Sequence, residues 1–570
     1  MGVRRLALLL ALSLALASQI GAVFRQNVSW DEFALLALAD TTATTGELHA
    51  GGRPGLAVWL LVPLVSGCDD EIAVVHRARL LWTGITALFL VGLALWIAEL
   101  EPVPSRRGGT ALLGVALLAL VPAFLWASVQ VRTDQLGLAG AALGGWLLLT
   151  SRRRPWIALA AGACFGIGFL GSQKSVYPIA LALLLAAGQL RLERDLAPRR
   201  EGARGLLAAA GFTAVLLAFE AAVAAAFRAH DGAATRVGMS RAFVESSLSI
   251  FEFYRHTIGL REYREMLPTL VPHALALAAL TVATPAALRR GGRRADQALL
   301  AWAVLCLGLA VALFHAAAFR YFWMTLGIFP AVAIALARGE ILAALAPAGR
   351  LMPAWAPAAT VVFAALLAVP AGFEATARLR DTQAVQRESF AFLHRDFAPT
   401  DAGFQPESAL FCQAGHQPFP TLFSQHLYRR FAGAARERNA AALLESFRTI
   451  PIQFLVESFR LNQFPVEVRR FWAENYQPYR ASVFVAGRRL AGPSGAELGF
   501  EILVPGAYRW LPGGGAHPVS VEGRTLAAGE VVELAAGRYS AQLLEDVPDG
   551  MLVLAVDDPP GPAPLSFYEN

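Results

Sequence analysis

Long apolar segments separated by short charged gaps fill the first 373 residues of the chain. Each has close to the roughly 20 residues that a helix needs to cross a bilayer. The first runs from Leu6 to about Phe24, and the others lie near 79–98, 110–127, 135–150, 156–173, 176–190, 205–227, 269–287, 298–318, 321–337 and 352–373. The pattern predicts about eleven membrane-spanning helices. The shorter apolar stretch 55–67 is better explained as an interfacial or re-entrant helix.

The first apolar segment has a second interpretation. Ala15-Leu16-Ala17 has the form of a signal-peptidase site, so a cleaved signal peptide is an alternative to a retained helix. We favour the retained helix, because the apolar run continues beyond that site to nearly the length of a span.

Arginine clusters give the predicted helices an orientation. They occupy alternate gaps, and basic clusters of this kind mark cytoplasmic loops. The clusters are Arg106-Arg107, Arg152 to Arg154, Arg191 to Arg204, Arg289 to Arg294, Arg338 and Arg350. The outer face then carries a long first loop (25–78), a second loop (228–268), short turns at 132–134, 174 and 319–320, and all residues after about 374.

Composition agrees with a membrane protein. Hydrophobic residues make up 56% of the chain and charged residues 16%, against roughly 25% charged in soluble proteins. These values exclude an ordinary cytosolic enzyme and a disordered chain. The net charge of +6 is carried by clusters between apolar segments, which favours membrane orientation over nucleic-acid binding. We predict a polytopic α-helical protein of a bacterial inner membrane, with its C-terminal region in the periplasm.

Two further regions follow the predicted membrane domain (1–373). Residues 374–490 have a mixed α/β pattern, and residues 491–570 alternate short strands with turns rich in glycine and proline, as in a small β-sandwich. Helices are predicted at 376–397 and 465–476, and strands at 408–412, 451–456, 481–486, 500–504, 518–521, 531–534 and 551–554.

The four cysteines form neither a disulfide scaffold nor a C-x-x-C metal site. Cys164 and Cys306 lie in apolar stretches and are predicted to be core residues. Cys68 and Cys412 both lie in predicted outer segments and could meet in an oxidising compartment, but the sequence does not show the geometry that a bond between them needs, so we do not favour the pairing.

Two adjacent carboxylates, Asp31 and Glu32, follow the first predicted span. Ser29 and Glu32 fit a capping box, and Asp31 would complement the helix dipole. A capping box uses Ser29 and Glu32 and leaves Asp31 available, so Asp31 is also a candidate general base for an acceptor hydroxyl or amine. Both interpretations stay open from the residues alone.

Three further outer turns carry candidate chemistry. In Arg132-Thr133-Asp134, the pair could anchor a turn, or it could supply a second acid beside a phosphate-binding cation. Lys174 is the only lysine in the chain and lies at the outer end of a predicted span. An ionisable group there either reaches the interface by its long side chain or has a function, such as contact with a phosphate oxygen.

The third turn contains His315, Arg320 and Tyr321. Arg320 suits bidentate phosphate contacts, whereas a lone histidine such as His315 is more often structural. His49 in the first loop is a weaker candidate of the same kind. Signatures for nucleotide binding, metalloproteolysis and serine hydrolysis do not occur in the sequence.

Together these motifs resemble the GT-C superfamily of membrane glycosyltransferases, in particular the bacterial relatives of protein O-mannosyltransferases and of the lipid A aminoarabinose transferase. The resemblance covers roughly residues 5–340. The motifs that carry it are Trp30-Asp31-Glu32-Phe33, Arg132-Thr133-Asp134, Gln173-Lys174 with Tyr177-Pro178, and Arg320-Tyr321-Phe322.

The resemblance implies transfer of a sugar from a polyprenyl-phosphate-linked donor to a lipid, glycan or protein acceptor on the outer face. It makes Asp31 the base or acceptor-orienting acid, with Glu32 in support and Asp134 as a second acid. It makes Lys174 and Arg320 the residues that hold the lipid phosphate. Some relatives use a divalent cation and others none, so metal and cofactor stay unassigned.

Two other functions fit a polytopic chain with an outer domain. A transporter of lipid-linked precursors would often show internal repeats and charges at mid-membrane depth, and neither is found in the sequence. A non-catalytic envelope scaffold would tolerate isosteric changes at the candidate residues but not loss of residues 374–570. The sequence favours the transferase.

Overall fold

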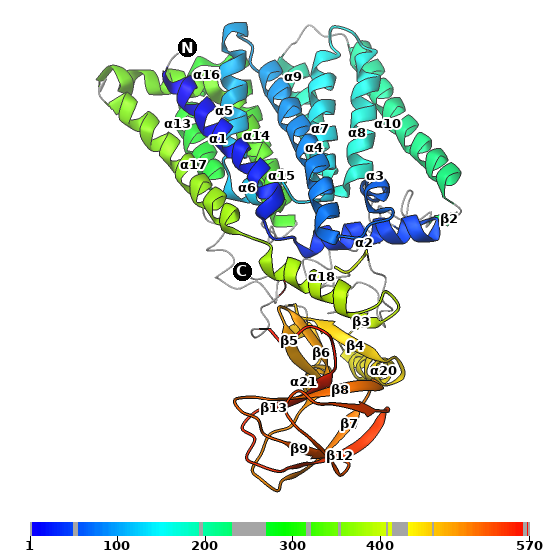
Figure 1. Cartoon of the computed structure of the whole chain (residues 1–570). Helices are drawn as coiled ribbons and strands as arrows, with labels where there is room; N and C mark the ends of the chain where they lie inside the picture. Colours follow the sequence, from blue (N-terminus) through cyan, green and yellow to red (C-terminus); the bar gives the residue numbers. More distant parts are fainter. Residues whose placement is uncertain are drawn as a thin grey trace. The chain divides into compact units, whose positions relative to one another are not determined.

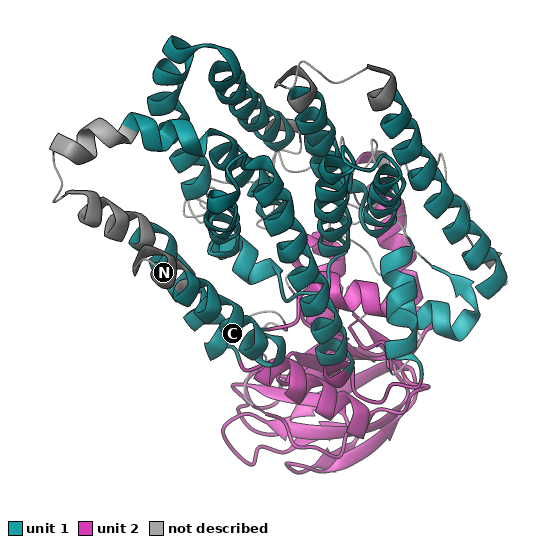
Figure 2. Ribbon diagram, turned by 90° about the horizontal axis from the view of Figure 1, so that it is seen from above, with its two compact units in different colours: residues 1–26, 38–66, 74–381 teal, residues 27–37, 67–73, 382–570 magenta. Residues whose placement is uncertain are grey.

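A computed structural model describes residues 3–570 except 50–54, 193–197, 228, 231–269, 315–320, 352–354, 406–408, 413–430, 432, 459–460, 562–566 and 568–570. The chain forms two compact units (Figure 2). Unit 1 comprises residues 1–26, 38–66 and 74–381, and unit 2 comprises 27–37, 67–73 and 382–570. Two short pieces of the predicted first loop therefore belong with the C-terminal region.

Unit 1 is a bundle of helices (Figure 1). Its described helices are α1 (Val3–Arg25), α2 (Trp30–Thr45, which begins in unit 2), α3 (Leu56–Val65), α4 (Glu71–Leu100, also beginning in unit 2), α5 (Arg107–Ala119), α6 (Pro122–Ala127), α7 (Thr133–Thr150), α8 (Ile157–Gly171), α9 (Val176–Leu192), α10 (Pro198–Ala226), α13 (Val271–Arg290), α14 (Gly292–Phe314), α15 (Phe322–Leu326), α16 (Ile328–Leu351) and α17 (Trp355–Arg380). Unit 1 also contains two short strands, β1 (Glu47–Leu48) and β2 (Ala229–His230), which pair in parallel.

Within the described residues, five helical segments are long and apolar enough to cross a membrane. They are Glu71–Leu100, Gly202–Ala226, Val271–Arg290, Gly292–Ala312 and Phe322–Ala344. Shorter apolar helices include α3 and α8. The ten-residue α3 agrees with the short, non-spanning helix predicted at 55–67. The total of about eleven spans stays a prediction.

The predicted span at 110–127 is divided into two helices. The helix α5 ends at Ala119 and α6 begins at Pro122. Proline has no backbone N–H to donate within a helix, so it is tolerated at a first helical position and disfavoured inside one. The expectation of one continuous helix was wrong because it weighed the apolar run above this proline.

Helices α7 and α8 pack closely because glycines line their contact. A Cβ placed on Gly140 would lie 2.5 Å from the Cys164 carbonyl oxygen and 2.6 Å from the Gly168 backbone nitrogen. Small residues that allow such backbone approach are typical of helix contacts in membranes. Figure 1 shows α7, α8 and α10 side by side. The α7–α8 contact positions the candidate site described below.

We expect Gly140→Ala to destabilise unit 1 by about 1–3 kcal/mol, because the added methyl meets rigid backbone rather than a movable side chain. The measurement is the thermal unfolding midpoint of the purified chain in a mild detergent. Gly84→Ala on α4 is the matched control, since a Cβ there has no atom within 4 Å. Equal midpoints for the two variants would show that α7 and α8 can separate without cost.

Unit 2 contains two β-sheets and several helices. A four-stranded sheet has the order β10-β9-β12-β7, and a seven-stranded sheet has the order β11-β8-β13-β6-β4-β3, with β5 paired to β6. The strands are β3 (Ala402–Phe404), β4 (Ile452–Val456), β5 (Tyr476–Arg480), β6 (Val483–Arg489), β7 (Glu497–Ile502), β8 (Gly506–Pro512), β9 (Val519–Val521), β10 (Arg524–Leu526), β11 (Val531–Leu534), β12 (Gly537–Leu543) and β13 (Gly550–Leu554). The longer helices of this unit are α18 (Ala384–Asp396), α20 (Arg436–Thr449) and α21 (Val466–Asn475).

The larger sheet continues across the predicted boundary at residue 490, because β13 pairs with β6 on one side and β8 on the other. One predicted strand in this unit was wrong. Residues 409–412 form no strand, and 406–408 lie outside the described residues. The backbone N–H of Ala409 donates to Gln405 Oε1 and that of Cys412 donates to Glu71 Oε1. Side chains therefore satisfy the donors that a strand would use for pairing.

Candidate functional site

Two of the predicted charged turns meet at one end of the α7–α8 pair in unit 1. Asp134 lies in the first turn of α7, and Lys174 lies in a short 3₁₀ helix that follows the end of α8 at Gly171. The start of α7 and the end of α8 come together because these consecutive helices pack against each other. Lys174 Nζ lies 3.1 Å from Asp134 Oδ1.

Arg132 joins this ion pair from the residue before α7. Its Nε lies 3.9 Å from Asp134 Oδ2, and its Nη1 donates to Gln130 Oε1 at 2.9 Å. Its carbonyl oxygen accepts a hydrogen bond from Trp82 Nε1 at 2.6 Å. The backbone and the guanidinium group of Arg132 are therefore both held in place by hydrogen bonds. Gln130 and Trp82 were not among the residues predicted from the sequence.

Tyr321 contributes a third segment of the chain, from just before α15. The Arg132 guanidinium carbon lies 3.7 Å from the centre of the Tyr321 ring, and Lys174 Nζ lies 4.4 Å from it. Cations near the face of an aromatic ring are stabilised by the ring's negative face. Residues predicted in three separate turns therefore form one cluster, here called the cation cluster: Arg132, Asp134, Lys174 and Tyr321.

The charge and burial of the cation cluster suit an anion. The side chains of Asp134 and Arg132 are 4% and 5% exposed, whereas Lys174 is 23% exposed. Two cations face one carboxylate, which leaves a net charge of +1 on the cluster and a lysine side chain that is partly exposed. A phosphate group matches this charge and the donor geometry of both cations. The adjacent Ser175 hydroxyl is buried and has no hydrogen-bond partner among the described residues.

A divalent cation does not fit the cation cluster, because Lys174 and Arg132 surround the one carboxylate that could bind it. Within the described part of the chain, no three histidine, cysteine or acidic side chains are grouped as metal ligands.

The other candidate residues predicted in outer segments are not part of the cation cluster or fall outside the described residues. Arg320 and His315 fall in the segment 315–320, outside the described residues. His49 follows β1, where its Nε2 lies 3.1 Å from Thr45 Oγ1 and 3.9 Å from Glu47 Oε2. It is therefore part of a local turn after α2.

Asp31 and Glu32 belong to unit 2, in the first turn of α2. The Ser29 backbone N–H donates to Glu32 Oε2 at 2.9 Å, which is one half of the predicted capping box. The other half is absent, because no described residue is a hydrogen-bond partner of the Ser29 hydroxyl. Asp31 is 6% exposed and takes no part in this cap.

The start of α2 is anchored firmly in unit 2. The Phe33 ring packs near the rings of Phe390 and Phe567, with centroid distances of 5.8 and 5.7 Å. The Gln386 side chain makes two buried hydrogen bonds of 2.9 Å to the backbone of Val28. Substitution of Asp31 therefore leaves the main supports of its helix in place.

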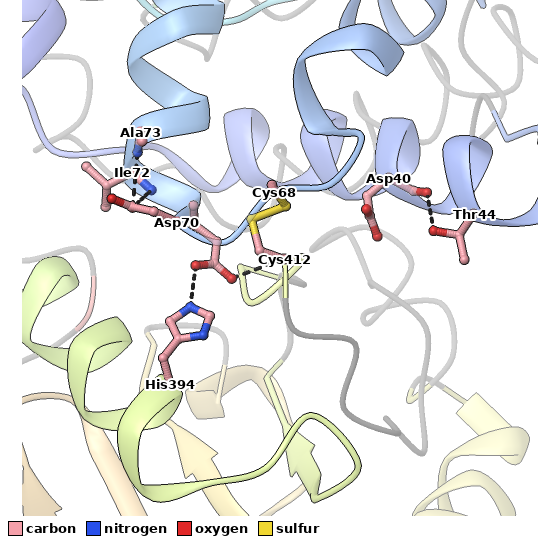
Figure 3. The surroundings of a disulfide bond; sticks show 9 residues. Asp40, Thr44, Cys68, Asp70, Ile72, Ala73, His394 and Cys412 are labelled. Carbon is pink, nitrogen blue, oxygen red and sulfur yellow. Dashed lines mark hydrogen bonds and ion pairs between the residues drawn. A yellow bond between two sulfur atoms is a disulfide. The ribbon is translucent and has the colours of Figure 1, made fainter.

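A disulfide between Cys68 and Cys412 links the first loop to the C-terminal region within unit 2 (Figure 3). From the sequence this pairing was possible but not favoured, and that preference was wrong because a contact across 344 residues depends on tertiary structure. Beside the disulfide, His394 Nε2 lies 2.6 Å from the fully buried Glu71 carboxylate. Neither His394 nor Glu71 was singled out from the sequence.

The hydrogen bond with Glu71 raises the pKa of His394, and the charges of Asp70 and Asp69 act in the same direction. A raised pKa means that the pair stabilises unit 2 fully below the unfolded pKa of about 6.5. That contribution is lost as the pH rises through the raised pKa of the folded state.

We therefore expect the thermal unfolding midpoint of the full chain to decrease as the pH rises above 6.5. His394→Gln should remove this pH dependence. The measurement is thermal unfolding at several pH values between 5.5 and 9. His517→Gln serves as the control, because His517 pairs with the exposed Glu545 and exposed pairs contribute little. The same pH profile in wild type and His394→Gln would contradict the assignment.

No protein-family model and no curated protein sequence matches the chain. It is similar to the solved structure of ArnT from Cupriavidus metallidurans, at 14% identity and a TM-score of 0.47 over 84% of this chain and 97% of that one. Another structure of that protein holds undecaprenyl phosphate.

Two further solved structures are similar at the same level. The Archaeoglobus fulgidus oligosaccharyltransferase tethered with an acceptor peptide has 12% identity and a TM-score of 0.46, over 97% of each chain. Arabinosyltransferase EmbB from Mycobacterium smegmatis has 14% identity and a TM-score of 0.42, over 95% of this chain and 64% of that one. All three proteins are GT-C superfamily glycosyltransferases, the class that the sequence motifs resemble. At TM-scores below 0.5, these similarities transfer no residue role or substrate to this chain.

Proposed function

We propose that this protein is a membrane glycosyltransferase that moves a hexosyl or pentosyl unit from a polyprenyl-phosphate-linked donor to an envelope acceptor. The observation that carries the proposal is the cation cluster, in which Lys174 and Arg132 face one buried carboxylate and leave a net positive site. The acceptor is a lipid, a glycan or a protein.

In the proposed reaction, an acceptor oxygen or nitrogen attacks the anomeric carbon of the donor sugar. The bond between that carbon and the phosphate oxygen breaks, and its electron pair leaves with the polyprenyl phosphate. Lys174 and Arg132 stabilise the charge that develops on this phosphate, which lowers the barrier. Asp134 holds Lys174 in position through the 3.1 Å ion pair.

Asp31 is proposed to accept the proton that the acceptor loses, with Glu32 supporting the helix start. A carboxylate suits this role because its oxygens can take up the acceptor's proton, and the carboxylate is regenerated when that proton passes to solvent. Arg320, adjacent in sequence to Tyr321, is proposed as a further phosphate ligand. His315 and His49 are proposed as weaker contacts to substrate.

The cell location is part of the same proposal. Disulfides persist in oxidising compartments, such as the bacterial periplasm, and are rare in the cytosol. The Cys68–Cys412 bond supports a periplasmic location for unit 2. Together with the basic clusters of unit 1, it favours a multi-pass protein of the inner membrane.

The test compares envelope glycolipids, glycans and glycoproteins by mass spectrometry in a deletion strain and a strain rescued with the wild-type gene. A transferase predicts the loss of one sugar-sized mass from an acceptor on deletion, its return on rescue, and accumulation of the lipid-linked donor. Unchanged masses in the deletion strain would reject the proposal.

Detergent-solubilised protein distinguishes the transferase from the transporter. Solubilised transferase converts donor and acceptor without a sealed membrane, whereas a transporter requires vesicles to show its activity. A scaffold predicts no product in either preparation, and full function from chains with isosteric changes in the cation cluster.

A further inference from the structure

A basic pocket lies at the end of unit 1 opposite to the cation cluster. It has a volume of about 380 Å³ and is lined by ten residues from several helix ends. The lining residues used below are Glu99, Arg107, Arg152, Arg153, Arg293 and Gln297. The 18 residues of α7 separate Asp134 from this pocket, and at 1.5 Å per residue they span about 27 Å. That distance is close to the thickness of a bilayer's hydrocarbon core, roughly 30 Å.

The pocket is strongly positive. Four arginines and one glutamate line it, a net charge of +3. Arg107 and Arg153 share the single carboxylate of Glu99, at 3.5 and 3.4 Å. Arg293, in the first turn of α14, has no ion pair within the described part of the chain.

Two neighbouring carboxylates among the described residues, Glu101 and Glu340, pair with arginines that do not line the pocket. Glu101 accepts from the Thr110 hydroxyl and pairs with Arg338. Glu340 pairs with Arg290 at 2.9 Å and with Arg294 at 3.5 Å. Neither of these two carboxylates therefore pairs with an arginine that lines the pocket. Arginines that only orient helices would have no need to converge from three helix ends on one cavity.

The surroundings of the pocket suit a lipid rather than a soluble anion. Leu100, Leu149 and Leu336 form part of its wall. On α4, the exposed residues Leu88, Val91 and Leu95 form one face of the helix, and spacings of three and four residues continue that face to Glu99. An acyl chain lying along this apolar face would bring its head group to the arginines.

We propose that the basic pocket binds the phosphate head group of an anionic phospholipid of the leaflet opposite to the cation cluster. Arg152 and Arg293 contact the phosphate, Gln297 donates to a head-group oxygen, and the leucines contact the glycerol and upper acyl chain. Basic pockets between membrane helices bind head groups by the same combination of charge and apolar wall. The bound lipid would fix the ends of α4, α7 and α14 together.

The test measures lipid binding to the purified full chain in a neutral detergent by native mass spectrometry, together with the unfolding midpoint. The added ligands are phosphatidylglycerol, phosphatidylcholine and soluble glycerol phosphate. Phosphatidylglycerol is expected to bind and to raise the midpoint, and Arg293→Gln is expected to weaken its binding about fivefold, as for loss of one cation near a lipid surface.

Arg294→Gln is the matched control, because Arg294 is the next residue of α14 but pairs with Glu340. Arg152→Gln provides a second variant should Arg293→Gln fold poorly. Equal binding of phosphatidylglycerol by Arg293→Gln and Arg294→Gln would overturn the proposal. Equal stabilisation by phosphatidylcholine would overturn it as well, and so would equal stabilisation by glycerol phosphate, which would indicate a soluble phosphate ester.

Discussion

Asp31→Asn is expected to lower the turnover number of sugar transfer by about 10²–10⁴-fold, the usual contribution of a general base. Asparagine keeps the size and the hydrogen-bonding shape of the side chain but cannot take the acceptor proton. Binding of the lipid-linked donor should change little, because the proposed donor contacts are Lys174 and Arg132. The measurement is the steady-state rate with solubilised protein, at saturating donor and varied acceptor.

The fold should survive this substitution, since Phe33 and Gln386 anchor the start of α2 independently of Asp31. Asp40→Asn is the control, because it makes the same change of charge nine residues further along the same helix. A turnover number equal to that of Asp40→Asn would mean that Asp31 only complements the helix dipole, and the proposed base would have to lie elsewhere.

Most of the helices could be predicted from the sequence because a buried or lipid-facing helix must be apolar along its length. The prediction failed at Pro122, where one imino acid divides a continuous apolar run. The close packing of α7 could also have been predicted from the sequence. Gly137, Gly140 and Gly144 recur at helical spacing along α7, and such a stripe predicts close packing against another helix.

The candidate site was predictable in its parts but not in its assembly. An unusual lysine and an Arg-x-Asp turn attract attention in a chain that otherwise uses arginine. That Tyr321 would lie below both cations depends on how α15 packs in the bundle, which no local pattern encodes. For the same reason, the partners of Glu71 could not be found from the sequence, since Cys412 and His394 lie more than 300 residues away.

In the β-rich region, too, some elements could be predicted from the local sequence and others could not. The strands β9, β11 and β13 were predicted because apolar residues alternate there between clear turns. The strands β8 and β12 were missed: each contains glycine, arginine or polar residues that obscure the alternation. Their pairing with β13 and β7 completes the sheets, so neighbours rather than local preference determine their structure.

Lys174→Gln is expected to lower the turnover number about 10²–10³-fold, the usual cost of removing one group that stabilises charge in the transition state. The substitution also leaves the buried Asp134 carboxylate with Arg132 as its cationic neighbour. A loss of activity could therefore come from the missing cation or from a disturbed ion pair. Lys174→Arg does not separate these causes, because a guanidinium differs from an ammonium in shape and reach.

The double variant Lys174→Gln/Asp134→Asn separates them, because it removes both charges of the pair and leaves no uncompensated carboxylate. Unfolding midpoints and turnover numbers of the two single variants and the double variant complete the cycle. If Lys174 stabilises the leaving phosphate, the double variant should regain the stability that Lys174→Gln loses but stay inactive. If the double variant regains turnover as well, Lys174 serves only to neutralise Asp134, and the phosphate must be held by other residues.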